Sequence, residues 1–465
     1  MSFSGYNVWG GLNAIAVLLL SLLFANILKR IIKPLKASLI PTSVLGGITL
    51  LIISSIVKIA TGETLFNMEF FGGNGMALFE IITYHALAIG FIASALKSTS
   101  KKMTKQRSVE IFNSGVTTVS TYLLQGIFGM AITIVACLVV TSLPNYAGVL
   151  LPFGYGQGTG QALNFGNIYE QSYGFVGGRT FGLTIAALGF LCASVGGVVH
   201  LNILKKKGRI IISKDGEGND NETFYDENEI PSNGSIDKFT VQIALIIIAY
   251  LLSFLAMFGL SRLIGMTDTI FGFNFLFGVI FATLIKATLN LLNKKQIIRR
   301  KYTNNFLLTR IGNFFFDIMV VSGIAAIDLT VLENYWGVIL ILGGVGLVIT
   351  YVYNLFIAKT LFKDYANEQF LAMFGMLTGT ASTGIILLRE IDGEFKTPAQ
   401  DNLVYQTLPA IVFGFPMMLL ANLAPKSPYL TFGILIAFFV VMNFILFRSK
   451  IFKRKAKEAN GNKIA

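Results

Sequence analysis

The chain has few charged side chains: Lys, Arg, Asp and Glu make up 13% of its 465 residues, whereas 54% are hydrophobic. An ordinary soluble domain carries about 25% charged residues, so this composition excludes that class. Apolar runs close to 20 residues long recur throughout the chain. Because about 20 apolar residues cross a hydrocarbon core, the composition predicts an all-α protein that crosses a lipid bilayer many times.

Cysteine and histidine are also scarce. The two cysteines, Cys137 and Cys192, fall in apolar runs and fit no metal-ligand spacing. The two histidines, His85 and His200, have no partner at ligand spacing, so we expect them to pack and not to relay protons. With no Ser/His/Asp arrangement and no paired carboxylates, the sequence argues against an enzyme and predicts no cofactor.

The apolar runs predict eleven membrane spans, five in each half and one more near the C-terminus. They lie near 8–28, 38–60, 76–96, 112–141, 179–204, 239–261, 272–292, 306–328, 335–357, 401–424 and 429–447. Basic clusters follow alternate spans, as they do in cytoplasmic loops. We therefore expect the N-terminus outside and the C-terminus in the cytoplasm. The same topology explains the net charge of +13 without nucleic acid.

The spans divide the chain into four segments. Residues 1–204 form a first five-helix repeat, and 239–424 form a second. Between them, 205–238 is acidic and rich in turn residues, which predicts a flexible cytoplasmic linker. Residues 425–465 add one helix and a basic cytoplasmic tail. An odd number of spans in each repeat places the two repeats in opposite orientations across the membrane.

One stretch in each repeat is rich in glycine and polar residues. The first, LPFGYGQGTGQALNFG, covers 151–166, and the second covers 370–392. A phosphate-binding loop is excluded for the first, because no strand precedes it and no Gly-Lys-Ser/Thr follows it. Close helix packing is an alternative, but it explains two matching stretches less well. We expect re-entrant segments near 145–170 and 367–392, since broken backbone survives in a membrane only inside protein or beside water.

Neutral oxygens and backbone N–H groups near the two glycine-rich tips suit a small anion and sodium. For the substrate we expect Gly156, Gln157, Gly158, Thr159, Gly160, Gln161, Thr380, Ser382, Thr383 and Arg389. For sodium we expect Asn164, Asn313, Asp317 and Thr378. A charge inside a span is a functional candidate by default. Asp317 can also pair with Arg310, however, and Arg389 can also cap its segment at the cytoplasmic surface. Arg179 is expected to be an interfacial anchor.

Interrupted segments in matching positions of inverted repeats are typical of secondary transporters with a binding site near the membrane midplane. The alternative from another class is a channel with re-entrant pore loops. Segments that enter from opposite faces suit alternating access better than a pore of identical loops.

Several motifs, in order along almost the whole chain, are similar to those of the bacterial glutamate:sodium symporter family. They are 40–47 (IPTSVLGG), 156–162 (GQGTGQA), 173–175 (YGF), 312–313 (GN) and 375–383 (GMLTGTAST). The resemblance implies ten core helices in two inverted halves, two re-entrant hairpins and a homodimer in the bacterial inner membrane. It also implies sodium-driven uptake of glutamate by an elevator-like movement.

The chain departs from that family at its glycine-rich tips and at its C-terminus. Tyr155, Gln157 and Gln161 stand where the family carries glycine, histidine and alanine, and the second segment lacks a Gly-His-Cys-Gly opening. The last span is outside the usual ten. A sodium-coupled transporter of di- or tricarboxylates therefore remains open beside glutamate transport.

Overall fold

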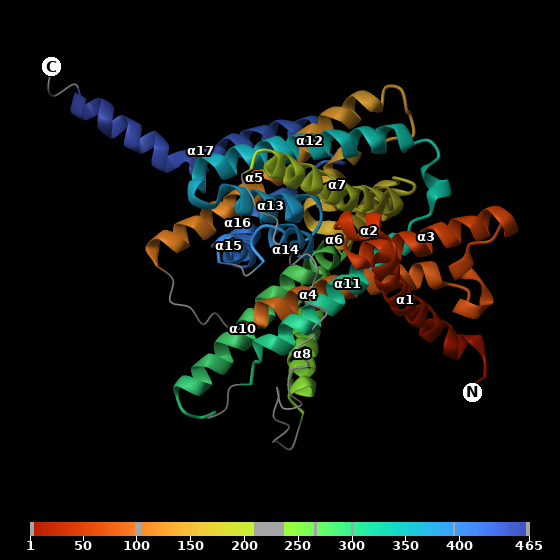
Figure 1. Ribbon diagram of the computed structural model, residues 1–465. Helices are drawn as coiled ribbons and strands as arrows, with labels where there is room; N and C mark the ends of the chain where they lie inside the picture. Colours follow the sequence, from red (N-terminus) through yellow and green to blue (C-terminus); the bar gives the residue numbers. More distant parts are fainter. Residues whose placement is uncertain are drawn as a thin grey trace. The chain divides into compact units, whose positions relative to one another are not determined.

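The computed structural model describes residues 4–97, 104–208, 237–264, 267–298, 302–393 and 396–461. In these ranges every regular element is helical, which confirms the predicted all-α class (Figure 1). Most of the predicted linker, 209–236, lies outside the described residues.

Ten of the described helices are long and apolar enough to cross a membrane. They are α1 (Tyr6–Ile31), α3 (Thr42–Thr61), α4 (Gly75–Leu96), α5 (Lys105–Ala136), α7 (Gly178–Lys206), α8 (Lys238–Ile264), α10 (Asn274–Lys294), α11 (Asn305–Ala325), α12 (Trp336–Leu361) and α17 (Pro428–Gly461). The pair α15 (Ala399–Tyr405) and α16 (Thr407–Leu423) raises the number to 11 if it is counted as one bent span. The predicted multi-pass membrane protein is thus confirmed by length and composition.

The remaining helices are short or interrupted. They are α2 (Lys33–Ala37), η1 (Leu65–Asn67), η2 (Glu69–Phe71), η3 (Ala147–Val149), α6 (Leu150–Tyr173), α9 (Thr267–Gly272), η5 (Leu329–Leu332), η6 (Lys363–Tyr365), α13 (Ala366–Thr378) and α14 (Ala381–Arg389). The two stretches expected to be re-entrant segments fall on α6 and on the pair α13 and α14.

Two predicted spans differ in detail from the observed helices. The span near 112–141 begins earlier, at Lys105, because the Thr104 side chain accepts a hydrogen bond from the Arg107 backbone N–H and caps a charged first turn. The span near 401–424 is bent by 50° between α15 and α16. Pro409 is the third residue of α16, where it has no backbone N–H to donate to the carbonyl of Tyr405, the last residue of α15.

The chain divides into two compact units, each built from both halves of the sequence. Unit 1 comprises Met1–Lys102, Gly158–Ala187 and Ser213–Glu333, and unit 2 comprises Met103–Gln157, Leu188–Ile212 and Asn334–Ala465. Unit 1 therefore holds the first three spans of each half, and unit 2 holds the fourth span of each half, α5 and α12. The chain passes from unit 2 to unit 1 within α6 and back within α7.

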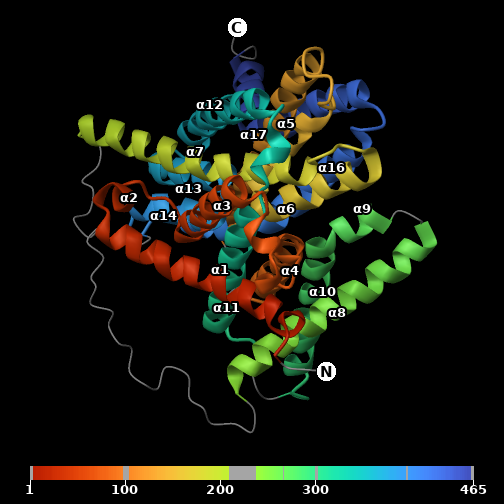
Figure 2. The ribbon, with the colours of Figure 1, turned by 90° about the vertical axis from the view of Figure 1, so that its right-hand side faces the viewer.

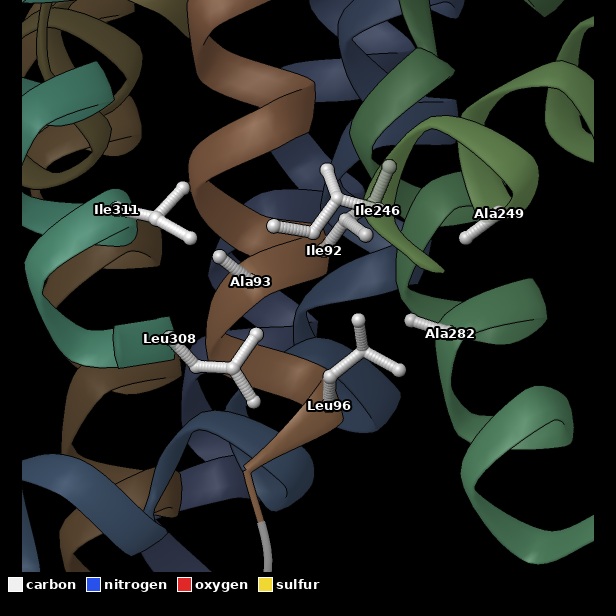
Figure 3. Packing of buried hydrophobic residues seen from close by; sticks show 8 residues of the cluster. All are labelled: Ile92, Ala93, Leu96, Ile246, Ala249, Ala282, Leu308 and Ile311. Carbon is white, nitrogen blue, oxygen red and sulfur yellow. The ribbon is translucent and has the colours of Figure 1, made fainter. Parts of the chain in front are cut away.

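The core of unit 1 surrounds α4, which packs against α8, α10 and α11 (Figures 2 and 3). Buried aliphatic side chains from all four helices form one cluster, comprising Ile92, Ala93, Leu96, Ile246, Ala249, Ala282, Leu308 and Ile311. Small residues bring these helices close. A Cβ added to Gly90 would lie 2.7 Å from the Phe316 ring, and one added to Gly278 would lie 2.7 Å from Ile92. This packing fixes α11, which lies beside the second part of α6.

An ion pair in unit 1 joins the end of α3 to the segment that follows α11. Lys58 Nζ donates to both carboxylate oxygens of Asp328, at 2.9 and 2.8 Å, and to Thr330 Oγ1 at 2.9 Å. Partial burial alone raises the pKa of Asp328, but the hydrogen bonds from Lys58 and Thr330 outweigh it and hold that pKa below its ordinary value. The folded protein therefore favours the charged carboxylate.

The lowered pKa of Asp328 predicts a pH-dependent contribution to stability. The unfolded carboxyl titrates near pH ~3.9, so the stabilisation is present above that pH and is lost as the pH falls through the lower folded pKa. Asp328→Asn should lower the free energy of unfolding by about 0.5–1 kcal/mol at pH 7, after allowance for solvent screening. Thermal unfolding of both proteins in detergent should converge at acidic pH. An undiminished difference there contradicts the assignment.

Candidate functional site

The first glycine-rich stretch is helical on both sides of a single break. Within α6, Gly158 has φ 76° and ψ −170°, a conformation that essentially only glycine adopts. The stretch expected to be re-entrant therefore consists of two helical segments, residues 150–157 and 159–173, joined at one residue. Thr159 and Gly160 begin the second segment, where backbone N–H groups lack partners within the helix.

The first segment of α6 belongs to unit 2 and packs antiparallel to α5. As the chain runs from Gly148 to Gly156, its neighbours on α5 run back from Gly129 to Tyr122. The Tyr122 hydroxyl donates to the Gly156 carbonyl oxygen at 2.9 Å, and a Cβ at Gly156 would collide with the Tyr122 ring. Glycine at 156 is thus required by a close approach. Gln157, the next residue, is half-buried.

The second segment of α6 belongs to unit 1 and packs against α11 and the start of α7. Thr159 is fully buried and its Oγ1 donates to the Met319 carbonyl oxygen at 3.1 Å. A Cβ at Gly160 would lie 2.7 Å from Leu87 and 2.9 Å from the Met319 sulfur. The Asn164 amide donates to the Gly272 carbonyl oxygen at 3.2 Å. These contacts hold the first turn after the break against the core of unit 1.

Gln161, in that first turn, is the most unusual of the predicted residues. Its side chain is 1% exposed, and neither Oε1 nor Nε2 has a hydrogen-bond partner among the described residues. Leaving a buried amide unpaired costs about 1–3 kcal/mol, and folded proteins rarely do so without a reason. Gln161 can donate and accept, so it is suited to a polar ligand.

The second glycine-rich stretch is an antiparallel pair of helices in unit 2. α13 ends at Thr378, and α14 begins at Ala381 after the non-helical residues Gly379 and Thr380. The pair is close, because a Cβ at Gly375 would lie 2.8 Å from the Cα of Gly384. At the break, Thr380 Oγ1 lies 3.4 Å from Thr383 Oγ1.

The polar side chains around this second break differ in exposure. Thr378 and Thr383 are fully buried, while Thr380 and Ser382 are half-buried. The Thr378 hydroxyl donates to the Phe374 carbonyl oxygen at 2.6 Å. The second break thus gathers four hydroxyl groups within a few residues.

Arg389 lies at the opposite end of α14 from this break. Arg389 is exposed. In the following loop Asp392 accepts hydrogen bonds from the backbone N–H groups of Lys396 and Thr397, at 2.8 and 2.9 Å, and from the Thr397 hydroxyl. Arg389 is thus separated from the break at Gly379 and Thr380 by the length of α14.

The predicted sodium ligands of unit 1 differ in their exposure and in their contacts. Asn313 and Asp317 lie on an exposed part of α11. The Asn164 amide, by contrast, donates a hydrogen bond to the Gly272 carbonyl oxygen. The expected alternative partner of Asp317, Arg310, lies over the Phe306 ring, 5.2 Å from its centroid. Across the described ranges no group of three His, Cys, Asp or Glu side chains is arranged to hold a metal ion.

Arg179 has a more specific role than an interfacial anchor. Its guanidinium forms ion pairs of 2.6 Å with Glu80 and of 2.6 Å with Glu170, and so joins α4, α6 and α7. Of the two histidines, His200 is buried and His85 is exposed. Nδ1 of His85 lies 2.7 Å from the Tyr250 hydroxyl, and Nδ1 of His200 lies 2.7 Å from the Tyr351 hydroxyl.

A buried polar network in unit 2 was missed by the sequence analysis. It comprises Ser114, Thr117, Thr118, Thr121 and Gln125 of α5 with Thr350, Asn354, Gln369, Asn402 and Gln406. The signal was present in residues 113–125 (NSGVTTVSTYLLQ), where polar side chains recur every three or four residues inside an apolar span. Positions with this spacing share one helix face, and the structure buries that face.

Comparison of the chain with protein-family models and with curated proteins gives no match.

Proposed function

We propose that the chain is a sodium-coupled secondary active transporter that imports glutamate by an elevator-like alternating-access mechanism. The observation that carries the proposal is the composition of the two units. Each draws the same spans from both halves of the sequence: the first three in unit 1, the fourth in unit 2. Alternating access in secondary transporters is largely the movement of one bundle of repeat-derived helices against another.

The two interrupted segments support the same proposal. The breaks at Gly158 and at Gly379 with Thr380 occupy corresponding places in the two halves, and buried polar side chains flank both. In this proposal the two segments are re-entrant, enter from opposite faces and carry the substrate at their tips. Free N–H groups at the start of each following helix favour an anion.

Transport by the inverted repeats would take place in a homodimer of the bacterial inner membrane, with the N-terminus outside. The Gln161 amide, which has no hydrogen-bond partner among the described residues, gives the substrate site a neutral donor and acceptor. Such an amide can bind a carboxylate group of a di- or tricarboxylate as well as it can bind glutamate. A di- or tricarboxylate substrate is therefore the second candidate, and the experiment below separates the two.

Uptake into proteoliposomes tests the proposal, with sodium and proton gradients imposed separately. We expect labelled glutamate to accumulate only with inward sodium flow. Because about 1.4 kcal/mol corresponds to a factor of ten, a tenfold sodium gradient should drive about tenfold accumulation for each coupled ion. Competition by aspartate, citrate and a neutral amino acid identifies the substrate class. Equal uptake without sodium contradicts the coupling, and unsaturated electrical current favours a channel.

A further inference from the structure

We propose that unit 2 contains a sodium site formed by the side-chain amide oxygens of Gln125 on α5 and Asn354 on α12, beside the C-terminal end of α13. The proposal rests on the proposed function, since it names residues that would hold the coupling ion. It assigns a set different from the one expected from the sequence. All of the residues concerned belong to one compact unit.

The orientation of the Gln125 amide is fixed by its neighbours. Its Nε2 donates to the Leu377 carbonyl oxygen at 2.9 Å and to Thr350 Oγ1 at 2.8 Å. A backbone carbonyl can only accept, so the amide nitrogen must face Leu377, and Oε1 must point elsewhere. Gln125 is fully buried, and Oε1 has no hydrogen-bond partner among the described residues.

The Asn354 amide is fixed in the same way. Its Nδ2 donates to the Thr350 carbonyl oxygen at 2.9 Å and lies 3.3 Å from Thr121 Oγ1. Asn354 is 2% exposed, and its Oδ1 also has no partner among the residues that the structure describes. Both amides donate to Thr350, one to its hydroxyl and one to its carbonyl. Two unpaired acceptors are thus held on facing helices around one residue.

The end of α13 adds negative potential at this place. α13 stops at Thr378, and the carbonyl groups of its last turn cannot find partners in a continuing helix, because Gly379 has φ −147° and ψ −109°. One of these carbonyls, that of Leu377, contacts Gln125 directly. A helix C-terminus carries about half a negative charge, which favours a cation.

The ligand set indicates sodium as the cation. The oxygens proposed as ligands come from amides, hydroxyls and backbone carbonyls, and all of these are neutral. Magnesium and calcium sites in proteins use carboxylates, which offset the doubled charge of the ion. A sodium ion carries a single positive charge, so neutral oxygens and a helix end can hold it without a buried counter-ion. Bound here, it would give Gln125 Oε1 and Asn354 Oδ1 a partner.

Thermal unfolding of the detergent-solubilised protein tests the site without transport. A ligand that binds only the folded state raises the melting temperature by mass action. We expect the wild-type melting temperature to rise with NaCl relative to choline chloride at equal ionic strength, and KCl to have little effect. Asn354→Leu and Gln125→Leu should raise the half-saturating NaCl concentration at least tenfold. A response to KCl equal to that with NaCl overturns the assignment of sodium.

Asn443→Leu is the matched control. Asn443 donates to the carbonyl four residues earlier, as Asn354 does, but its oxygen is paired with the Tyr353 hydroxyl at 2.8 Å. Its replacement should lower stability and leave the half-saturating sodium concentration unchanged. A sodium response that weakens equally in Asn443→Leu and Asn354→Leu would make the loss a general effect of destabilisation and would overturn the site.

Uptake separates failure of the sodium site from failure of the proposed function. Sodium-driven uptake with unchanged sodium affinity in both Leu variants defeats the site alone. A sodium-dependent melting temperature without any uptake leaves the site standing and defeats the transporter.

Discussion

Gln161→Met is expected to reduce uptake strongly and at the same time to stabilise the protein. The amide of Gln161 is buried and has no hydrogen-bond partner among the described residues. Folding therefore removes its hydrogen bonds to water and replaces them with none. Methionine has nearly the same shape and no such polar group. Its introduction should raise the free energy of unfolding by about 1–3 kcal/mol. If the amide binds substrate, uptake should fall at least about tenfold, which corresponds to the loss of one hydrogen bond to a charged group.

The two effects are measured by thermal unfolding in detergent and by uptake into proteoliposomes. Gln242→Met provides the matched control, because Gln242 is equally buried but fully paired. It donates to the carbonyl oxygens of Lys238 and Tyr302 and accepts from the Asn304 backbone N–H. That substitution should destabilise. A Gln161→Met protein that is less stable, or that transports normally, shows that the amide is part of the packing.

Gly158→Ala is expected to destabilise the protein and to reduce uptake strongly. The φ of 76° with ψ of −170° at Gly158 lies in a region that residues with a Cβ essentially avoid. Forcing alanine into it costs about 1–3 kcal/mol. Relief of the strain would move Thr159, Gly160 and Gln161, which follow directly. We therefore expect at least about a tenfold loss of uptake, since misplaced binding groups lose the benefit of orientation.

Gly344→Ala separates this effect from the general response of a helix to alanine. Gly344 lies within α12, and an added Cβ would meet nothing within 4 Å. At such a position alanine should stabilise by about 0.5–1 kcal/mol. If the two variants have the same melting temperature and the same uptake, the break in α6 has no energetic or functional weight.

Hydropathy sufficed to predict the helical class and the long apolar helices. Long apolar runs gave the spans because a helix is the only way for such a run to cross lipid with its backbone groups paired. Where the prediction missed, a local contact decided the outcome. The Thr104 cap extended α5 toward the N-terminus, and Pro409 bent the span near 401–424. Both signals are short and polar, so a count of apolar residues passes over them.

The candidate site was harder to predict, for a physical reason. Glycine marks where backbone can break, and Gly158 did mark such a place. Which polar side chain remains unpaired, however, depends on neighbours far away in the sequence. Gln161 and Asn164 are close in the chain, yet among the described residues only Asn164 finds a partner, at Gly272. The network of α5 is similar, because its hydroxyl groups and the Gln125 amide nitrogen are hydrogen-bonded to residues of the other half.

The pairing of Gln125 also has a consequence for the order in which the protein is made. Gln125 is hydrogen-bonded to Thr350 and to Leu377, residues separated from it by 225 and 252 positions. During synthesis α5 therefore enters the bilayer with its buried polar face uncovered, and it stays so until α12 and α13 arrive. Newly made first halves must keep this face shielded, whether by the insertion machinery or by one another. The polar face of α5 can thus be paired only after α12 and α13 have been made, and a chain truncated before α12 leaves it without these partners.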